Sequence, residues 1–134
     1  MTNLVISEIR VIEHGQQITA PSDEVFVEGD LARQDTTDGQ LTGTLGTTAT
    51  EANWAGLVIN IDAGQVVTVA GNGSLVTLGS ALDAVAYGAN IFVSDTANTI
   101  ADSTGTAGVK VGIVEAVRNQ GTVYKALRLI KELN

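Results

Sequence analysis

The feature that most constrains this chain is a series of short apolar segments separated by turn residues, which begins at Trp54 and continues almost to the C-terminal end. The segments AGLVINI, QVVTVAG, NIFVS and VKVGIVEAV are rich in Val and Ile, and between them stand turn sequences such as DAG, NG and DTA. β-Branched residues favour pleated strands, and short strands at close intervals are typical of barrels and sandwiches. The pattern predicts an all-β fold, a small β-barrel or β-sandwich of short antiparallel strands.

Several individual elements follow from the same pattern. Asn72-Gly73 lies between two apolar runs and favours a type I′ turn, so it predicts a hairpin. NIFVS and NTIA flank DTA as a second hairpin, VKVGIVEAV forms a longer strand, and SALDAVAYGA has room for one helical turn. The closing segment TVYKALRLIKELN fits two patterns, because Val123, Ala126, Leu127, Ile130 and Leu133 would share a helical face. We expect a strand that ends near Leu129.

The first 53 residues are less regular. NLVISEIRVIEH is rich in β-branched residues and predicts an extended N-terminal strand or arm, and EVFVEGDLARQ predicts a strand around Phe26 with a bend at Gly29. Residues 35–53, DTTDGQLTGTLGTTATEAN, contain mostly Thr and Gly with few apolar residues, which predicts a long loop or arm that orders on binding. A chain of 134 residues is close to the usual size of one domain, so residues 1–134 are expected to form a single β domain with its compact core in 54–134.

Composition excludes several classes of protein. The chain has no cysteine, which removes disulfides and thiolate metal sites. It also has no basic start and no apolar run long enough for a membrane helix, so we expect a soluble protein made in the cytoplasm. Net charge is −8, but residues 1–109 hold two basic and thirteen acidic residues, whereas residues 110–134 hold five basic and two acidic ones. An acidic body is a poor partner for nucleic acid.

Few residues suggest chemistry. His14 is the only histidine, and Glu13 is its only adjacent carboxylate, so a catalytic arrangement would need distant partners that no motif identifies. Asp95, Asn98, Asp102 and Ser103 offer oxygen ligands for calcium, but a short predicted strand separates the two aspartates and the EF-hand pattern is absent. We expect no enzymatic activity, no metal and no cofactor.

The second half of the chain resembles the small phage capsid decoration (cement) proteins. The resemblance covers Trp54 to Ile130, and Gly29-Asp30 in VFVEGDLARQ is similar to an early strand of that family. The family pattern is a Gly before an aromatic-bearing strand, a polar hairpin, a Val/Thr strand, a glycine-rich loop and two closing strands. Its counterparts here are Gly88, Phe92, the turn from Asp95 to Asn98, Thr99 and Ile100, Gly105 and Gly108, Val111 to Ala116, and Gly121 to Leu129.

This resemblance implies a non-enzymatic virion protein on the outer surface of a phage head, where it bridges major capsid protein subunits and forms a homo-oligomer, a dimer or trimer. It implies no nucleic-acid or membrane partner. We expect contacts with the capsid or a neighbouring subunit from the N-terminal strand, the Thr/Gly segment, the single tryptophan and the basic C-terminal residues. These are Val5, Ile9, Ile12, Thr36, Leu41, Leu45, Trp54, Arg118, Lys125 and Arg128, with Lys131 beside the last three.

Other interpretations of the same residues stay open. Trp54 stands at a strand start, where a single tryptophan is more often a core residue than an interface anchor. The basic C-terminal residues either meet an acidic capsid patch or balance the acidic body within an oligomer. The main alternative function is a carbohydrate-binding or adhesive β module of a phage fibre, although five aromatics are few for a binding platform. A small hydrolase that uses His14 is a third possibility.

Overall fold

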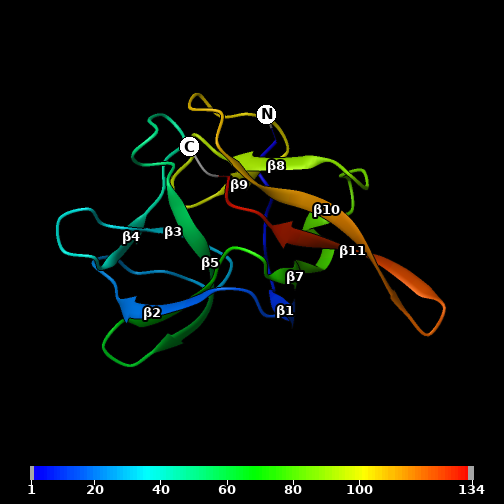
Figure 1. Ribbon diagram of the computed structural model, residues 1–134, viewed down its shortest axis with the longest axis horizontal. Coiled ribbons are helices and arrows are strands. Elements are labelled where there is room, and N and C mark those ends of the chain that lie inside the picture. The colour runs from blue at the N-terminus through cyan, green and yellow to red at the C-terminus, as the bar shows by residue number, and fades with distance from the viewer. Residues whose placement is uncertain (1, 133–134) are drawn as a thin grey trace.

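The computed structural model describes residues 2–132 and consists of two antiparallel β-sheets (Figure 1). The six-stranded sheet has the order β1 (Arg10–Glu13), β7 (Leu75–Thr77), β11 (Thr122–Leu129), β10 (Lys110–Asn119), β8 (Asn90–Val93) and β9 (Ile100–Ala101). The five-stranded sheet has the order β2 (Gln17–Pro21), β6 (Val66–Ala70), β5 (Trp54–Asp62), β3 (Leu31–Gln34) and β4 (Leu41–Gly43). The predicted all-β fold is confirmed, as a sandwich rather than a closed barrel. Within residues 2–132, no helix is long and apolar enough to cross a membrane.

The apolar residues form two clusters, because β5 contributes buried side chains to both of its faces. Leu57 is fully buried in the larger cluster, which lies between the sheets and also takes Leu127 from β11. Its neighbour Val58 is fully buried in a smaller cluster with Phe26 on the other face of the five-stranded sheet. Successive strand residues point to opposite faces, so this sheet needs cover on both sides.

The two sheets are joined by a pair of segments that run antiparallel and change sheets together. Within 10–21 and 66–77, β1 pairs with β7 in one sheet and β2 pairs with β6 in the other. The crossing requires glycine, because a Cβ on Gly15 would lie 2.3 Å from the carbonyl oxygen of Asn72. There the N–H of Gly15 donates to Ser74 Oγ at 3.0 Å.

The hairpin predicted at Asn72-Gly73 is therefore wrong. The strands on either side, β6 and β7, belong to different sheets and do not pair with each other. Only Gly73 has a positive φ, of 88°, and the N–H of Ser74 donates to the Gly71 carbonyl at 3.1 Å, which is the pattern of a type II turn. The type I′ position is Gln120-Gly121, where φ is 49° and 84° in the turn that joins β10 to β11.

The other expectations for the second half are confirmed. β8 and β9 form the predicted hairpin, β10 is the longest strand of its sheet, and β11 ends at Leu129. The helical turn is a 3₁₀-helix at Gly79–Leu82. Leu133, which would have completed a helical face, lies outside the described residues.

The expectations for the first half need correction. The N-terminal strand is limited to β1 and a bridge from Asn3 to Ala101. No strand forms around Phe26, because residues 24–30 turn so that this ring covers the outer face of the five-stranded sheet. The Thr/Gly segment 35–53 is not a free arm: it contains β4, and its residues Leu41 and Ala52 are fully buried.

A single asparagine joins the far ends of the two sheets. Asn98 lies between β8 and β9 with φ of 60°, and its N–H and side-chain Oδ1 bond the carbonyl and N–H of Thr44, both at 3.0 Å. Its own carbonyl accepts the N–H of Leu31 at 2.9 Å, and its Nδ2 donates to Glu24 Oε1 at 2.6 Å. Leu31 and Thr44 belong to β3 and to the end of β4, so these bonds connect the sheets directly. We call this set the Asn98 junction.

We predict that Asn98→Ala lowers the free energy of unfolding by about 2–4 kcal/mol, because it leaves Thr44 N–H unpaired and places a Cβ-bearing residue without a side-chain amide at positive φ. Asn98→Gly should lose less, since glycine accepts this φ without strain. Urea denaturation measures both changes. The matched control is Asn90→Ala, which removes an exposed asparagine from the same hairpin. Equal stability of Asn98→Ala and Asn90→Ala would contradict the role of the junction.

Candidate functional site

Three exposed valines give the strongest candidate for a contact surface in the described chain. Val5, Val25 and Val27 are 81%, 77% and 63% exposed, well above the other large apolar residues. Val5 and Val27 line the same hollow of about 300 Å³, between the N-terminal segment and the turn at residues 27–30. Val25 does not line this hollow but lies two residues from Val27 in the sequence, and we call the three residues the valine surface. Large exposed apolar side chains grouped in this way mark interaction surfaces more often than isolated ones do.

The turn under the valine surface is fixed by Gly29 and Asp30. Gly29 has φ of 96°, and a Cβ there would lie 2.7 Å from Ile6 Cγ2, so the turn packs closely on the N-terminal segment. The N–H of Val27 donates to Asp30 Oδ2 at 3.0 Å. Burial raises the pKa of Asp30 above its ordinary value and repulsion from Glu24 adds to this, while the Val27 N–H acts in the opposite direction. A partly buried carboxylate, that of Asp30, thus accepts the backbone N–H of one residue of the valine surface, Val27.

Of the three valines, only Val5 is among the contact residues that the sequence predicts. Val5 was expected to make contacts, and it is the most exposed of the chain's large apolar residues that the structure describes. Val25 and Val27 were missed, because VFV was interpreted as a strand with its ordinary share of buried residues. The V-F-V pattern itself held the signal, because Phe26 is buried and both of its neighbours are exposed.

The other predicted N-terminal residues are less accessible. Ile9 is half-buried and packs against the larger apolar cluster. Ile12 is also half-buried and lines a second hollow, of about 350 Å³, together with Lys125. The hollow lined by Ile12 and the hollow lined by Val5 and Val27 have no lining residue in common.

Trp54 is a core residue. Its side chain is 1% exposed, and its Nε1 donates to the carbonyl of Lys110 at 2.9 Å. Lys131 lies over the ring, 5.1 Å from the centroid, and its Nζ donates to Asn53 Oδ1 at 2.6 Å and to the Trp54 carbonyl. Burial lowers the pKa of Lys131. Trp54 and Lys131 line a groove of about 610 Å³, and the exposed Thr36 lies at the same groove.

The two leucines predicted as contacts lie at different depths. Leu41 is fully buried in the smaller apolar cluster, so its side chain is not on the surface. Leu45 is half-buried. The choice of Leu41 and Trp54 as contact residues therefore does not fit their positions, and for Trp54 the core interpretation is correct.

Most of the basic C-terminal residues bond within the chain. Arg128 donates to Glu13 Oε1 at 2.8 Å and to Glu115 at 3.3 Å, and these carboxylates, Glu13 first, raise its pKa. Lys125 donates to the carbonyl of Asp83 at 3.1 Å and lies 5.3 Å from the ring centroid of Tyr87. Arg118 is exposed near the end of β10 and makes no hydrogen bond or ion pair with residues 2–132. Of these three residues only Arg128 is paired with carboxylates, whereas Lys125 bonds neutral groups and keeps its charge.

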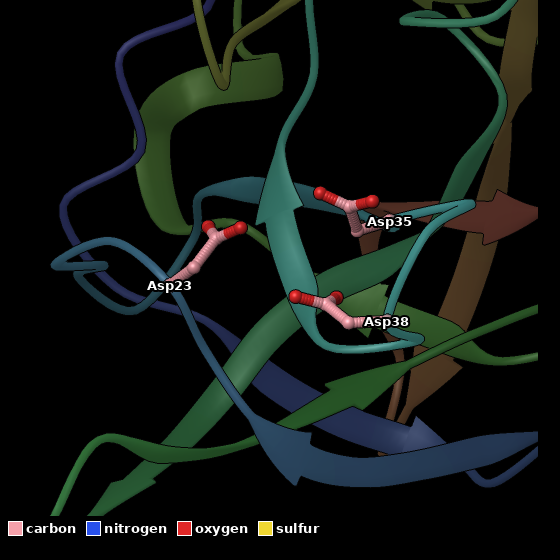
Figure 2. A group of neighbouring side chains, drawn as sticks. All are labelled: Asp23, Asp35 and Asp38. Atoms are coloured by element: carbon pink, nitrogen blue, oxygen red, sulfur yellow. The ribbon is translucent and has the colours of Figure 1, made fainter.

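The structure brings together three carboxylates that sequence analysis did not group. Figure 2 shows Asp23, from the segment after β2, beside Asp35 and Asp38 from the loop between β3 and β4, and their oxygens lie within 4.8 Å of one another. Asp35 Oδ1 accepts the N–H of Thr37 at 2.8 Å, and Asp38 Oδ1 accepts that of Gln40 at 2.9 Å. Each of these two keeps one carboxylate oxygen for a hard cation such as calcium. The D-T-T-D spacing was visible in the sequence, but the approach of Asp23 depends on the fold.

The residues first considered for calcium serve separate turns. Asp95 accepts the Oγ1–H of Thr106 at 2.6 Å and its N–H at 2.8 Å, and these bonds lower the pKa of Asp95. Asp102 Oδ1 accepts the N–H of Thr2 at 2.9 Å, and Asn98 belongs to the Asn98 junction. His14, the only histidine, is exposed in the crossing between β1 and β2.

Comparison with protein-family models, with curated proteins and with solved structures finds no match to this chain.

We predict that Asp30→Asn raises the free energy of unfolding at pH 7 by about 0.5 kcal/mol, a small value because partial exposure screens the charge. The raised pKa means that the folded state disfavours the carboxylate, so the penalty is absent below the unfolded pKa and appears as pH rises through the folded pKa. Asparagine still accepts the Val27 N–H. Urea denaturation at pH 3 and pH 7 should show the gain at pH 7 alone. Asp62→Asn, at an exposed site, controls for general charge, and an equal gain there would contradict the assignment.

We predict that the three-carboxylate group destabilises the fold at low ionic strength and that calcium relieves this repulsion. Calcium should raise the midpoint of thermal unfolding more than sodium chloride of equal ionic strength does. Asp38→Asn keeps the oxygen that accepts the Gln40 N–H, and it should raise the midpoint in low salt and remove the extra effect of calcium. The same midpoint in both salts would show that the group holds no cation.

Proposed function

We propose that this chain is a non-enzymatic virion structural protein that binds the outer surface of a phage head and stabilises it by bridging major capsid protein subunits. The observation that carries the proposal is the valine surface, a strongly exposed apolar group on a sandwich whose second half resembles the capsid decoration proteins. Burial of apolar area is the main source of affinity in protein association, at about 25 cal/mol per Å².

The internal bonding of the basic residues supports contacts of this apolar kind. Arg128 is paired with Glu13 and Glu115, and residues 1–109 hold thirteen acidic and two basic residues, so attraction to an acidic capsid patch is weakened. Apolar contacts and backbone hydrogen bonds are weakly screened by salt, unlike exposed charge pairs. Head binding through the valine surface should therefore persist at high ionic strength.

A decoration protein needs many modest contacts rather than one strong site. On a shell of repeated subunits, contacts made together retain the protein far better than any one contact alone. The carbohydrate-binding alternative has less support, because Trp54 and Phe26 are buried and Tyr87, 50% exposed, lies beside the ammonium of Lys125.

We predict that the purified protein co-sediments with empty, expanded heads assembled from the major capsid protein of its own genome, at a fixed ratio to capsid subunits and across a salt series. Val5→Asp should weaken this binding about tenfold or more, because a charge replaces an apolar side chain in the interface and each tenfold is about 1.4 kcal/mol. Val5 is 81% exposed, so folding should be unaffected.

The matched control is Val123→Asp, which adds the same charge at an exposed valine on β11. It should bind as the wild-type protein does. If both substitutions weaken binding to heads equally, the added charge alone explains the weaker binding, and the valine surface is not the binding site. If the wild-type protein fails to bind heads at every salt concentration, the decoration role itself is wrong.

A further inference from the structure

The sandwich has four sheet edges, and two of them are covered by the chain itself. At β9, the N–H of Leu4 donates to the carbonyl of Ile100 at 2.9 Å and Asn3 bridges to Ala101. At β4, the N–H of Asp23 donates to the carbonyl of Leu41 at 3.0 Å. The remaining edges, β1 and β2, lie at the lower side of the molecule in Figure 1, whereas β8 and β9 lie at the upper side.

The hydrogen-bonding direction along β2 follows from its register with β6. The backbone N–H of Ser22 donates to the carbonyl of Gln65 at 2.9 Å, and the carbonyl of Gln16 accepts the N–H of Gly71 at 2.7 Å. The backbone N–H and carbonyl groups of the even-numbered residues therefore face β6. Strand residues alternate in direction, so the backbone groups of Gln17, Thr19 and Pro21 point outward. Within residues 2–132 nothing bonds these groups. Proline lacks an N–H, so the outward side offers two donors and three acceptors.

This edge also lies in an uncharged part of an acidic protein. Residues 14–22 contain no Asp, Glu, Lys or Arg, and neither do residues 63–82, which include the adjacent strand β6. The whole chain has a net charge of −8, so acidic surfaces away from this edge repel a second copy. The edge of β2 thus lets two copies meet without direct contact between like charges.

β1 is a poorer edge for pairing. Its register with β7 is interrupted by a bulge between Val11 and Glu13, and its ends carry Arg10 and Glu13. Bulges and charges are features that protect edge strands from pairing. β2 has five residues in continuous register with β6 and carries neither a bulge nor a charge, and its one protective feature is Pro21 at the end of the strand.

We propose that a second copy of this chain pairs with β2 in an antiparallel manner across a two-fold axis at Thr19, which joins two five-stranded sheets into one. In this register the N–H of each Thr19 donates to the carbonyl of the other. The N–H of each Gln17 donates to the carbonyl of the opposite Pro21, so every outward donor of β2 has an acceptor. Pro21 has no N–H to donate, so the Gln17 carbonyl is the one outward acceptor without a donor from the partner, and it bonds water instead.

The side chains fit the same register. Ile18 and Ala20 are half-buried at the edge of the smaller apolar cluster, and two-fold pairing places each Ile18 beside the opposite Ala20. Both would lose exposed apolar area. On the other face Thr19 is exposed, and its Oγ1 lies 2.9 Å from that of Thr68 on β6. The inference does not depend on the decoration role, because it concerns the free protein.

Sedimentation equilibrium over a concentration series tests the proposal. The wild-type protein should associate to twice its 13.8 kDa mass. Thr19→Lys should weaken the association about tenfold or more in low salt, because two lysines then stand opposite each other at the axis. Thr68→Lys is the matched control: it loses the same hydroxyl contact and adds the same charge, but it lies one strand, about 4.8 Å, further from the partner. It should associate nearly as the wild-type protein does.

A mixture of Thr19→Lys and Thr19→Asp chains gives a positive readout that a folding defect cannot imitate. Each variant alone should be largely monomeric, and the equimolar mixture should form mixed dimers, because opposite charges then face each other. A wild-type protein that is monomeric at all concentrations would overturn the proposal, as would an oligomer that Thr19→Lys leaves intact. A monomer whose binding to heads is lost in Thr19→Lys, but not in Thr68→Lys, would assign the edge to a capsid strand and overturn the self-pairing.

Discussion

The sandwich depends on the Asn98 junction, where one residue with a positive φ connects the ends of two sheets. Four hydrogen bonds from Asn98 reach Leu31, Thr44 and Glu24, so β3 and β4 are held against the β8–β9 hairpin. A Cβ on Gly43 would lie 2.4 Å from Asn98 Oδ1, so β4 needs a residue without a side chain at this position. Unpaired buried backbone groups are costly, and the junction satisfies them where the sheets separate.

This junction closes one side of the molecule and leaves the other side open. At the closed side, residues 2–4 and 22–23 complete the edges of β9 and β4, and the turn at Gly29 raises the valine surface beside them. At the open side, the glycine-rich crossing carries the chain from β1 to β2 and leaves β2 with free backbone groups. An apolar surface and a free strand edge are two different means of association, which suits a protein whose proposed role is to connect subunits.

The sequence predicted the fold class and most of the second half, because local patterns decide those elements. The strand up to Leu129 and the β8–β9 hairpin depend on residue type and turn chemistry alone. Asn72-Gly73 misled because a turn dipeptide does not show whether its flanking strands share a sheet. The contact residues were harder: Val5 is exposed, but Leu41 and Trp54 are buried, because the Thr/Gly segment and β5 both pack within the sandwich. Which side of a segment faces solvent is a tertiary property that periodicity indicates only after the strand is placed.

The most direct test of the central claim is a cryo-electron microscopy reconstruction of empty expanded heads saturated with the protein. We expect ordered density for the sandwich on the outside of the shell, with the valine surface against the capsid protein and β2 directed away from it or toward a second copy. Such a map would place the apolar contact and the free edge in one assembly. Shells without added density, or density that contacts the capsid through another face while Val5 stays in solvent, would contradict the account.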